Sequence, residues 1–476
     1  MPLLFHANRF GLIASLLICP CSIFAIEKFD SQTMLTDESV PGSWSYQAEY
    51  ATEIPSDTDW WKSFEDPILD SIINVAIANN YDVAMAAKRI NIANYNVKTA
   101  QAGLYPQLNL NAGWTKSRSS GMLGSQPGNA SNSSYFDMGL NMSWQVDLFG
   151  KISSQAKGKE LLYKASKAEF DGVMLSVASS IAQTYFQLRV WQAELQVANE
   201  HSERQRKVVA IAEARFECEL ASKLDVTQAR GVYYSTQASI PVLENSINTA
   251  INSLALMMGV YPEDIQYTLR APAALPDYHQ LMPIGVPADL IRRRPDIIAS
   301  EMELASYAQA LGVAKKDFLP TLTINGSIGT SSHRINDMFS KESLGYSITP
   351  TLSWTVFDGL SRKYNKAIAR EQLEVAIDSY NLSVMTAIND VNDALSSYTA
   401  SIKHIDALQR VIEQSDESLK LSIDLYKNSL TQFSNVVDAQ MSVLENQNSL
   451  IVAHGQALSN IVKLYEAIGG GWSNNL

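Results

Sequence analysis

The chain has 476 residues, a formal net charge of -12 and a hydrophobic content of 46%, which is ordinary for a globular protein. The acidic balance argues against a nucleic-acid partner, since phosphate binding requires clustered Lys and Arg. Six His and three Cys form no close cluster with metal-ligand spacing and no glycine-rich phosphate loop follows a predicted strand, so the sequence predicts no metal site, no cofactor, no catalytic residue and no enzyme activity.

The N-terminus has the pattern of a secretory signal peptide over residues 1–25. Arg9 precedes a short apolar stretch, and Ala25 suits conventional cleavage. The alternative is lipidation of Cys19 or Cys21, although neither follows the small residue that a bacterial lipobox requires. Beyond the signal no apolar run of about 20 residues occurs, so no transmembrane helix is expected. That absence leaves membrane-spanning strands possible, because they carry no such run.

Four segments alternate strictly between apolar and polar residues, which predicts half-buried strands. They are about ten residues long with Trp and Tyr near their ends, as is typical of lipid-facing barrel strands. A soluble sandwich also alternates, but four strands are few for one. Polar loops over residues 117–134 and 330–344 join them in pairs, and Pro106 and Pro320 mark the passage from helix to strand. The predicted strands cover residues 107–115, 135–147, 321–328 and 346–356.

Very long helices follow the strands. No Gly or Pro occurs over residues 173–230 or 360–454. In both stretches apolar or small residues recur in alternating steps of three and four, which indicates coiled-coil packing. A helix of roughly 65 residues is about 100 Å long. Each stretch is predicted to turn near residues 219–222 or 429–432 and run back as a hairpin, and Pro241 is predicted to interrupt and kink the first returning helix.

The chain repeats itself. Residues 142–147 resemble 352–358, and residues 215–230 resemble 425–440 at the same offset of 210. A shared offset predicts two related halves joined by a Pro-rich linker. The predicted segments are a signal peptide (1–25), an extended segment (26–66), a first repeat with a helix, two strands and a hairpin (67–271), a linker (272–287), a second such repeat (288–468) and a tail (469–476).

Assembly follows from the number of strands. Four amphipathic strands cannot close a barrel alone, and an open sheet edge cannot lie in lipid. Three copies supply about twelve strands and about twelve long helices. A ring of that many helices is hollow, so the expected fold is a trimeric twelve-stranded β-barrel continued by a twelve-helix α-barrel. The natural function of such a tube is passage.

Four motifs, in order along the chain, resemble those of the TolC-like outer-membrane efflux factors, in particular the NodT-type subfamily that serves tripartite drug pumps. The resemblance covers nearly the whole mature chain. The motifs are Trp60-Trp61 with Phe64-x-Asp66-Pro67, Ser143-Trp144-x-x-Asp147-Leu148-Phe149-Gly150, Arg293-Arg294-Pro295-Asp296-Ile297 with Glu301, and Leu464-Tyr465-x-Ala467-x-Gly469-Gly470-Gly471-Trp472.

This resemblance implies an exit duct in the outer membrane, with its helical barrel in the periplasm, that passes drugs or other small molecules. The implied partners are two further copies of the chain, a periplasmic adaptor, an inner-membrane pump and outer-membrane lipid. Two alternatives are kept: the duct of a type I protein secretion system, and a periplasmic adaptor. An adaptor would have one helical hairpin and no lipid-facing strands.

The resemblance also places a periplasmic gate at the hairpin tips. It implies mouth-lining carboxylates at Asp225 and Asp438, with Tyr426 in the bonding network of the tip and Asn435 where some relatives have Asp. Threefold rings of carboxylates attract cations, so the closed mouth is expected to prefer them. The bland alternative is that both Asp residues are ordinary surface charges.

The tips also depart from the family. Glu219 and Ser429 stand where the turns commonly have Gly, so each turn must avoid a positive φ or tolerate it at a cost. The arginine run at 292–294 is interpreted as a solvated or ion-paired junction before the helix that Pro295 begins. Gly150 and Gly359 are expected to allow a sharp corner between strand and helix.

Overall fold

The computed structural model describes residues 59–118, 120, 132–276 and 293–470, together with Met34, Leu35, Pro41 and Trp44. The predicted signal peptide and both candidates for lipidation, Cys19 and Cys21, lie outside these residues, as does most of the predicted linker. Within the described part of the chain, no helix is both long and apolar enough to cross a membrane.

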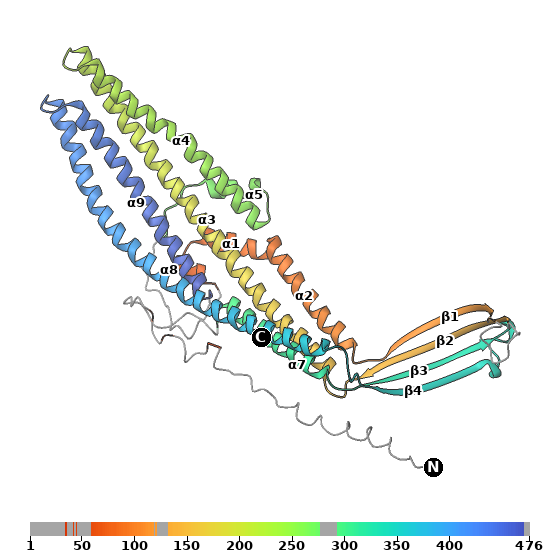
Figure 1. Cartoon of the computed structure of the whole chain (residues 1–476). Coiled ribbons are helices and arrows are strands. Elements are labelled where there is room, and N and C mark those ends of the chain that lie inside the picture. Colours follow the sequence, from red (N-terminus) through yellow and green to blue (C-terminus); the bar gives the residue numbers. More distant parts are fainter. Residues whose placement is uncertain are drawn as a thin grey trace, which may run out of the picture.

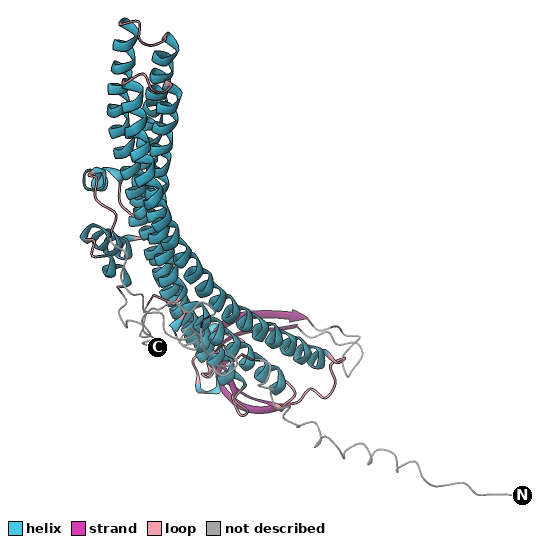
Figure 2. Cartoon of the chain, turned by 90° about the vertical axis from the view of Figure 1, so that its left-hand side faces the viewer, coloured by secondary structure: helices cyan, strands magenta, loops and turns pink. Residues whose placement is uncertain are grey.

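The molecule is elongated, with a sheet at one end and two helical hairpins reaching to the other (Figure 1). The view turned by 90° shows the same separation of strands and hairpin tips (Figure 2). A 3-10 helix, η2 (Trp60–Phe64), precedes the first repeat, which contains α1 (Pro67–Asn79), α2 (Tyr81–Ala102), β1 (Gln107–Arg118), β2 (Asn132–Val146), α3 (Lys151–Glu217), α4 (Lys223–Met258) and α5 (Pro262–Arg270). The second contains α7 (Pro295–Lys316), β3 (Thr321–Ser332), η3 (Ile335–Asp337), η4 (Lys341–Ser343), β4 (Leu344–Ser353), α8 (Ser361–Lys427) and α9 (Phe433–Ala467).

The four strands form one antiparallel sheet in the order β1-β2-β3-β4. Its register aligns apolar residues with apolar residues: Leu140 of β2 lies between Leu110 and Ile328. The next residue, Asn141, lies between Asn109 and Ser327. Because side chains alternate between faces along a strand, this register builds one apolar and one polar face across the whole sheet.

The fourth strand is shorter than the sequence predicts. β4 ends at Ser353, so Trp354 and Val356 lie beyond the ladder. The indole nitrogen of Trp354 donates to the carbonyl of Phe318 at 3.0 Å, and that of Trp144 donates to the carbonyl of Leu104 at 2.9 Å. Both Trp side chains therefore fasten the point where a helix passes into a strand, once in each repeat.

The long helices turn where the sequence predicts. α3 and α8 have 67 residues each, which corresponds to about 100 Å. The seam of α8 is buried from Ile377 to Tyr398 and at Ile405, but from Leu408 onward its residues are only half-buried until Tyr426. α3 packs against α2, α4, α7 and α9.

Pro241 does not interrupt the first returning helix, so the predicted interruption is wrong. α4 is continuous from Lys223 to Met258 with Pro241 inside it. The proline lies on the exposed side of α4, so the carbonyl that loses its hydrogen bond faces solvent and can bind water. The opposite side of the helix is held by packing against α3, which offsets the loss.

Two glycines let the end of a long helix lie close to the backbone just before another helix begins. Gly259 at the end of α4 has φ +66, and a Cβ there would lie 2.6 Å from the carbonyl oxygen of Asn79. Gly469 at the end of α9 has φ +86, and a Cβ there would lie 3.2 Å from the carbonyl oxygen of Arg293. These glycines are 210 residues apart, so the same close junction occurs in both repeats.

The core lies at mid-length, where η2 packs beneath the long helices. The Trp60 ring stacks on Tyr465 of α9 with 5.2 Å between centroids. Asp66 caps α1 by accepting from the backbone amide of Ile68, and its other oxygen accepts from the Tyr185 hydroxyl at 2.5 Å. Burial and this bond raise the pKa of Tyr185. The first motif therefore has a structural role, because its side chains join α1, α3 and α9.

Candidate functional site

The hairpin tips are the candidate functional site, and both turns have the same backbone conformation. Glu219 and Ser429 each have φ 61, so the turns tolerate the left-handed conformation rather than avoid it. In both tips the next residue donates back to the last helical turn, from Leu220 to the Arg215 carbonyl at 2.8 Å and from Leu430 to the Leu425 carbonyl at 2.9 Å. A side chain in this conformation costs about 1–2 kcal/mol relative to Gly.

A hydrogen bond joins the two hairpins. The Tyr426 hydroxyl at the end of α8 donates to Asp225 Oδ2 at 3.0 Å. Asp225 lies in the first turn of α4, where the helix dipole favours a carboxylate. Its other oxygen accepts from the Ser222 hydroxyl at 2.6 Å. Burial and the bond to Asp225 raise the pKa of the Tyr426 hydroxyl, so it remains a donor.

Arg215 is a tip residue that the sequence prediction missed. From the last turn of α3 it donates to the Lys427 carbonyl at 2.7 Å and to the Ser429 hydroxyl at 2.8 Å, both on the other hairpin. Its guanidinium lies 4.8 Å from the centre of the Tyr426 ring. The sequence does contain a signal for it, because Arg215 differs from Leu425, the residue at the equivalent position of the second repeat. Only the asymmetry between repeats could have found it.

The other two predicted gate residues are not part of this link. Asn435 donates to the Thr431 hydroxyl at 2.7 Å within its own hairpin. Asp438 lies on α9 with its side chain exposed, and it makes no hydrogen bond or ion pair with any residue of the described chain. The structure therefore brings Asp225 and Tyr426 together, and it does not bond Asn435 or Asp438 to either of them.

Beneath the polar link, apolar side chains of all four long helices form a small tip cluster. The Tyr426 ring meets the Phe433 ring edge-on at 5.0 Å between centroids. The leucines at the turns themselves, Leu220 and Leu430, are 65% and 72% exposed. The tip is thus bonded inside and apolar at its outermost points. The cluster consists of Val208, Ala212, Val226, Ala229, Tyr426, Phe433 and Val436.

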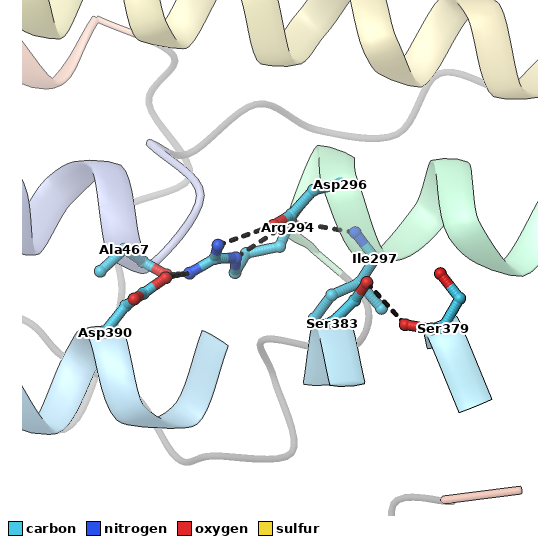
Figure 3. Close-up of polar contacts among 7 residues, drawn as sticks. All are labelled: Arg294, Asp296, Ile297, Ser379, Ser383, Asp390 and Ala467. Carbon is cyan, nitrogen blue, oxygen red and sulfur yellow. Dashed lines mark hydrogen bonds and ion pairs between the residues drawn. The ribbon is translucent and has the colours of Figure 1, made fainter. Parts of the chain in front are cut away.

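The arginine motif of the second repeat forms an ion-paired junction, as interpreted from the sequence (Figure 3). Arg294 donates to both oxygens of Asp296 at 2.7 and 3.0 Å. It also donates to Asp390 of α8 at 3.0 Å and to the Ala467 carbonyl at the end of α9 at 3.1 Å. One guanidinium therefore joins the start of α7, the middle of α8 and the end of α9. Pro295 begins α7, with Asp296 in its first turn.

No candidate metal centre occurs in the described residues, where no three His, Cys, Asp or Glu side chains are placed to share an ion. Both corner glycines have the positive φ that was predicted, +69 at Gly150 and +66 at Gly359. Leu360, next to the second corner, also has φ 71. Such a value is unusual for a bulky side chain, so this corner is the more strained of the two.

Comparison with known proteins gives consistent results. The family model described as outer membrane efflux protein matches residues 72–260 and 286–470. The probable outer membrane lipoprotein SilC of Salmonella typhimurium is 26% identical over 421 residues, covering 87% of this chain and 88% of that protein. The toluene efflux pump outer membrane protein TtgI of Pseudomonas putida is 28% identical over 428 residues, covering 90% of each.

A solved structure of the outer-membrane channel OprN is similar along its whole length. It superposes with a TM-score of 0.82 at 27% identity, covering 91% of this chain and 99% of OprN. The two long hairpins and the four-stranded sheet therefore have a counterpart in a known outer-membrane channel.

Proposed function

Since this chain belongs to the outer membrane efflux protein family, we propose that three copies of it form the exit duct of a tripartite efflux machine. The protein is an outer-membrane efflux channel, and its helical part extends into the periplasm. What is proposed is the number of copies, the partners, the cargo and the residues of the gate.

The apolar face of the sheet is the observation that carries the proposal. It spans all four strands, and large side chains on it are exposed in the single chain, among them Leu110, Leu140 and Ile328. β1 and β4 each have one neighbour, so both edges of the sheet are open. Neither an apolar face in water nor an open edge in lipid is stable. Three copies, edge to edge, satisfy both requirements.

Small molecules are the proposed cargo, delivered by an inner-membrane pump through a periplasmic adaptor. The support is the family and the names of relatives such as TtgI, which is called part of a toluene efflux pump. A protein-secretion duct would share the architecture and is the second candidate. An adaptor is disfavoured, because the chain has two hairpins and a four-stranded sheet where an adaptor would have one hairpin.

The repeat boundaries are also proposed, with halves over residues 67–271 and 288–468. Their support is the equal element order, the equivalent Trp anchors and the equivalent glycine junctions of the two halves. Cys19 and Cys21 remain candidates for a lipid anchor, and the name of the SilC relative, a probable lipoprotein, favours that option.

The gate is proposed to be the link between the two hairpins. The mouth of the tube can widen only if the hairpins move apart, and the bond from Tyr426 to Asp225 opposes that motion. Arg215 adds two further bonds between the same hairpins. Asp438 and Asn435 are proposed to line the mouth, where carboxylates repeated about a threefold axis would favour cations.

The efflux function is tested by deleting the gene in its own host and measuring accumulation of a hydrophobic dye. Loss of the channel should raise the steady-state dye content, and the wild-type gene on a plasmid should restore it. Light scattering of the purified protein in detergent should give three chains per particle. A stable single chain, or unchanged dye content in a host without a second such channel, would refute the proposal.

The gate is tested by Tyr426→Phe, which removes only the hydroxyl and keeps the ring in the tip cluster. Losing a partly buried bond to a carboxylate costs about 1.5 kcal/mol per copy, so the open fraction per link should rise about tenfold. Planar-bilayer recordings should show more frequent or larger openings. Tyr163→Phe, on α3 far from the tip, is the matched control. Unchanged conductance in Tyr426→Phe would remove this bond from the gate.

The mouth carboxylates are tested by replacing Asp225 and Asp438 together with Ala. The double variant should lose cation preference and open more readily, while Asp406→Ala, an exposed carboxylate elsewhere on α8, should keep both properties. If the double variant keeps the conductance and ion selectivity of the parent, the exposed leucines Leu220 and Leu430 become the better candidates for closure.

A further inference from the structure

Two helices carry a regular row of side chains that stay exposed within the described part of the chain. The ring contact among them is within α2 itself, from the Lys98 ammonium group to the centre of the Tyr95 ring at 5.6 Å. On α2 the row rises in steps of four and three through Tyr81, Met85, Lys88, Ile92 and Tyr95, and Tyr81 is 73% exposed. We call this row the α2 stripe. On α8 the same steps give the α8 stripe: Tyr364, Ile368, Glu371, Val375, Asp378, Leu382 and Met385. All twelve side chains are exposed.

Each stripe lies opposite a face that is already packed. α2 buries Val83, Ala86 and Val97 against the body of the chain, and α8 buries a row that includes Leu373, Tyr380 and Val384. At about 100° per residue, a buried row offset by two positions lies on the far side of the helix. A helix with two opposite seams fits a closed ring, in which it contacts a neighbour on both sides.

The two stripes lie on the first and the last helix of a row of four neighbouring helices. α3 contacts α2 and α7, and α7 contacts α8, which gives the order α2-α3-α7-α8. This order runs parallel to the strand order β1 to β4. α2 leads into the open edge strand β1, and the open edge strand β4 leads into α8. When β4 of one copy pairs with β1 of the next, α8 must therefore lie beside α2 of that next copy.

We propose that the α8 stripe of one copy packs antiparallel against the α2 stripe of the next, with Lys88 held between Glu371 and Asp378. This inference rests on the proposed assembly and identifies the helix contact between neighbouring copies. The partner is a second copy of this chain, not lipid or an adaptor, because each stripe is continuous with a sheet edge that only another copy can pair.

The register follows from distance to the sheet. Tyr95 lies seven residues before Ala102, the end of α2, and Ile368 lies seven residues after Ser361, the start of α8. Both are therefore about 10 Å from the sheet side. Lys88 lies fourteen residues from its helix end, whereas Glu371 and Asp378 lie ten and seventeen from theirs. The residue carrying the ammonium group is thus about 6 Å of axial rise from Glu371 and about 4.5 Å from Asp378.

Shape and charge agree with this pairing. The sheet-side half of the α8 stripe borders a groove of about 630 Å³ between α7 and α8, lined by Tyr307, Tyr364, Ile368 and Val375. Large side chains such as Tyr95 of the next copy have room there. The α2 stripe carries a cation where the α8 stripe carries two carboxylates, and opposite charges at such seams set partner choice and register.

Cysteine cross-linking in isolated outer membranes tests the register. The variant carries Tyr95→Cys and Ile368→Cys in a Cys218→Ser background, and copper phenanthroline supplies the oxidant. The expected result is linked dimers and trimers on non-reducing gels, because a disulfide requires Cα atoms within about 7 Å. The pair Tyr95→Cys with Leu382→Cys is the control. Its cysteines lie about 20 Å apart along the seam and should leave the chain as monomer.

Charge reversal tests the pairing. Lys88→Glu should lower the yield of assembled trimer at least threefold, and adding Glu371→Lys and Asp378→Lys should restore it. Arg89→Glu, one residue further and about 100° around the helix, should leave the yield unchanged. A trimer that forms normally but never cross-links through Tyr95→Cys and Ile368→Cys would overturn the seam and leave the channel function intact. A parent protein that is monomeric in membranes would overturn both.

Discussion

A lysine on the lipid-facing side of the sheet should prevent assembly, whereas a lysine on the next residue should not. Leu140 lies in the middle of β2, between Leu110 and Ile328 on the apolar face. Leu140→Lys places an ammonium group near the bilayer midplane, which costs about 2–4 kcal/mol in such barrels. Three copies give a total of about 6–12 kcal/mol, comparable to the whole stability of an ordinary domain.

The matched variant is Asn141→Lys, since Asn141 lies on the polar face between Asn109 and Ser327. Its lysine would point into water and cost little. The assay is the amount of heat-labile trimer extracted from outer membranes, compared on gels with and without boiling. Leu140→Lys should lose most of the trimer and Asn141→Lys should keep it. Equal yields would refute the assignment of the two faces, whatever the yield was.

Three further outcomes are expected. Glu219→Gly and Ser429→Gly should each stabilise the protein by about 1 kcal/mol, because Gly relieves the positive φ. Thermal unfolding measures this, and Lys207→Gly, at an exposed position inside α3, should instead destabilise by a similar amount. His201 is buried, and burial holds the pKa of its imidazole below the usual range, so the stability it contributes is complete above about pH 6.5 and is lost as the pH falls. His201→Gln should therefore weaken the pH dependence of the unfolding midpoint between pH 7 and 5. An unchanged pH dependence would contradict this. Arg294→Ala should destabilise by about 2 kcal/mol in denaturant unfolding, with Arg294→Lys intermediate since an ammonium cannot reach all three acceptors; equal stability of the Lys variant and the parent would show that the fork geometry is unimportant.

The elements of this protein were predictable because their signals are local. Alternation of period two placed all four strands, with Leu140 and Asn141 on opposite faces, and steps of three and four placed α3 and α8. The repeat offset located both turns within a few residues. Pro241 was misjudged because a proline breaks a helix only when its surroundings cannot compensate, and the exposed side of α4 can.

The sequence by itself determined the two-repeat architecture, the amphipathic faces and the need for other copies, since these depend on periodicity and strand count. Only the tertiary structure decided which side chains meet across the repeats. Arg215 reaches Lys427 and Ser429, and Tyr426 reaches Asp225, although about 200 residues separate each pair. Such contacts depend on how two hairpins pack side by side, and no local pattern encodes that distance. The polar link at the tip therefore needs both a residue in which the two repeats differ, Arg215 against Leu425, and the packing that brings it to the other hairpin.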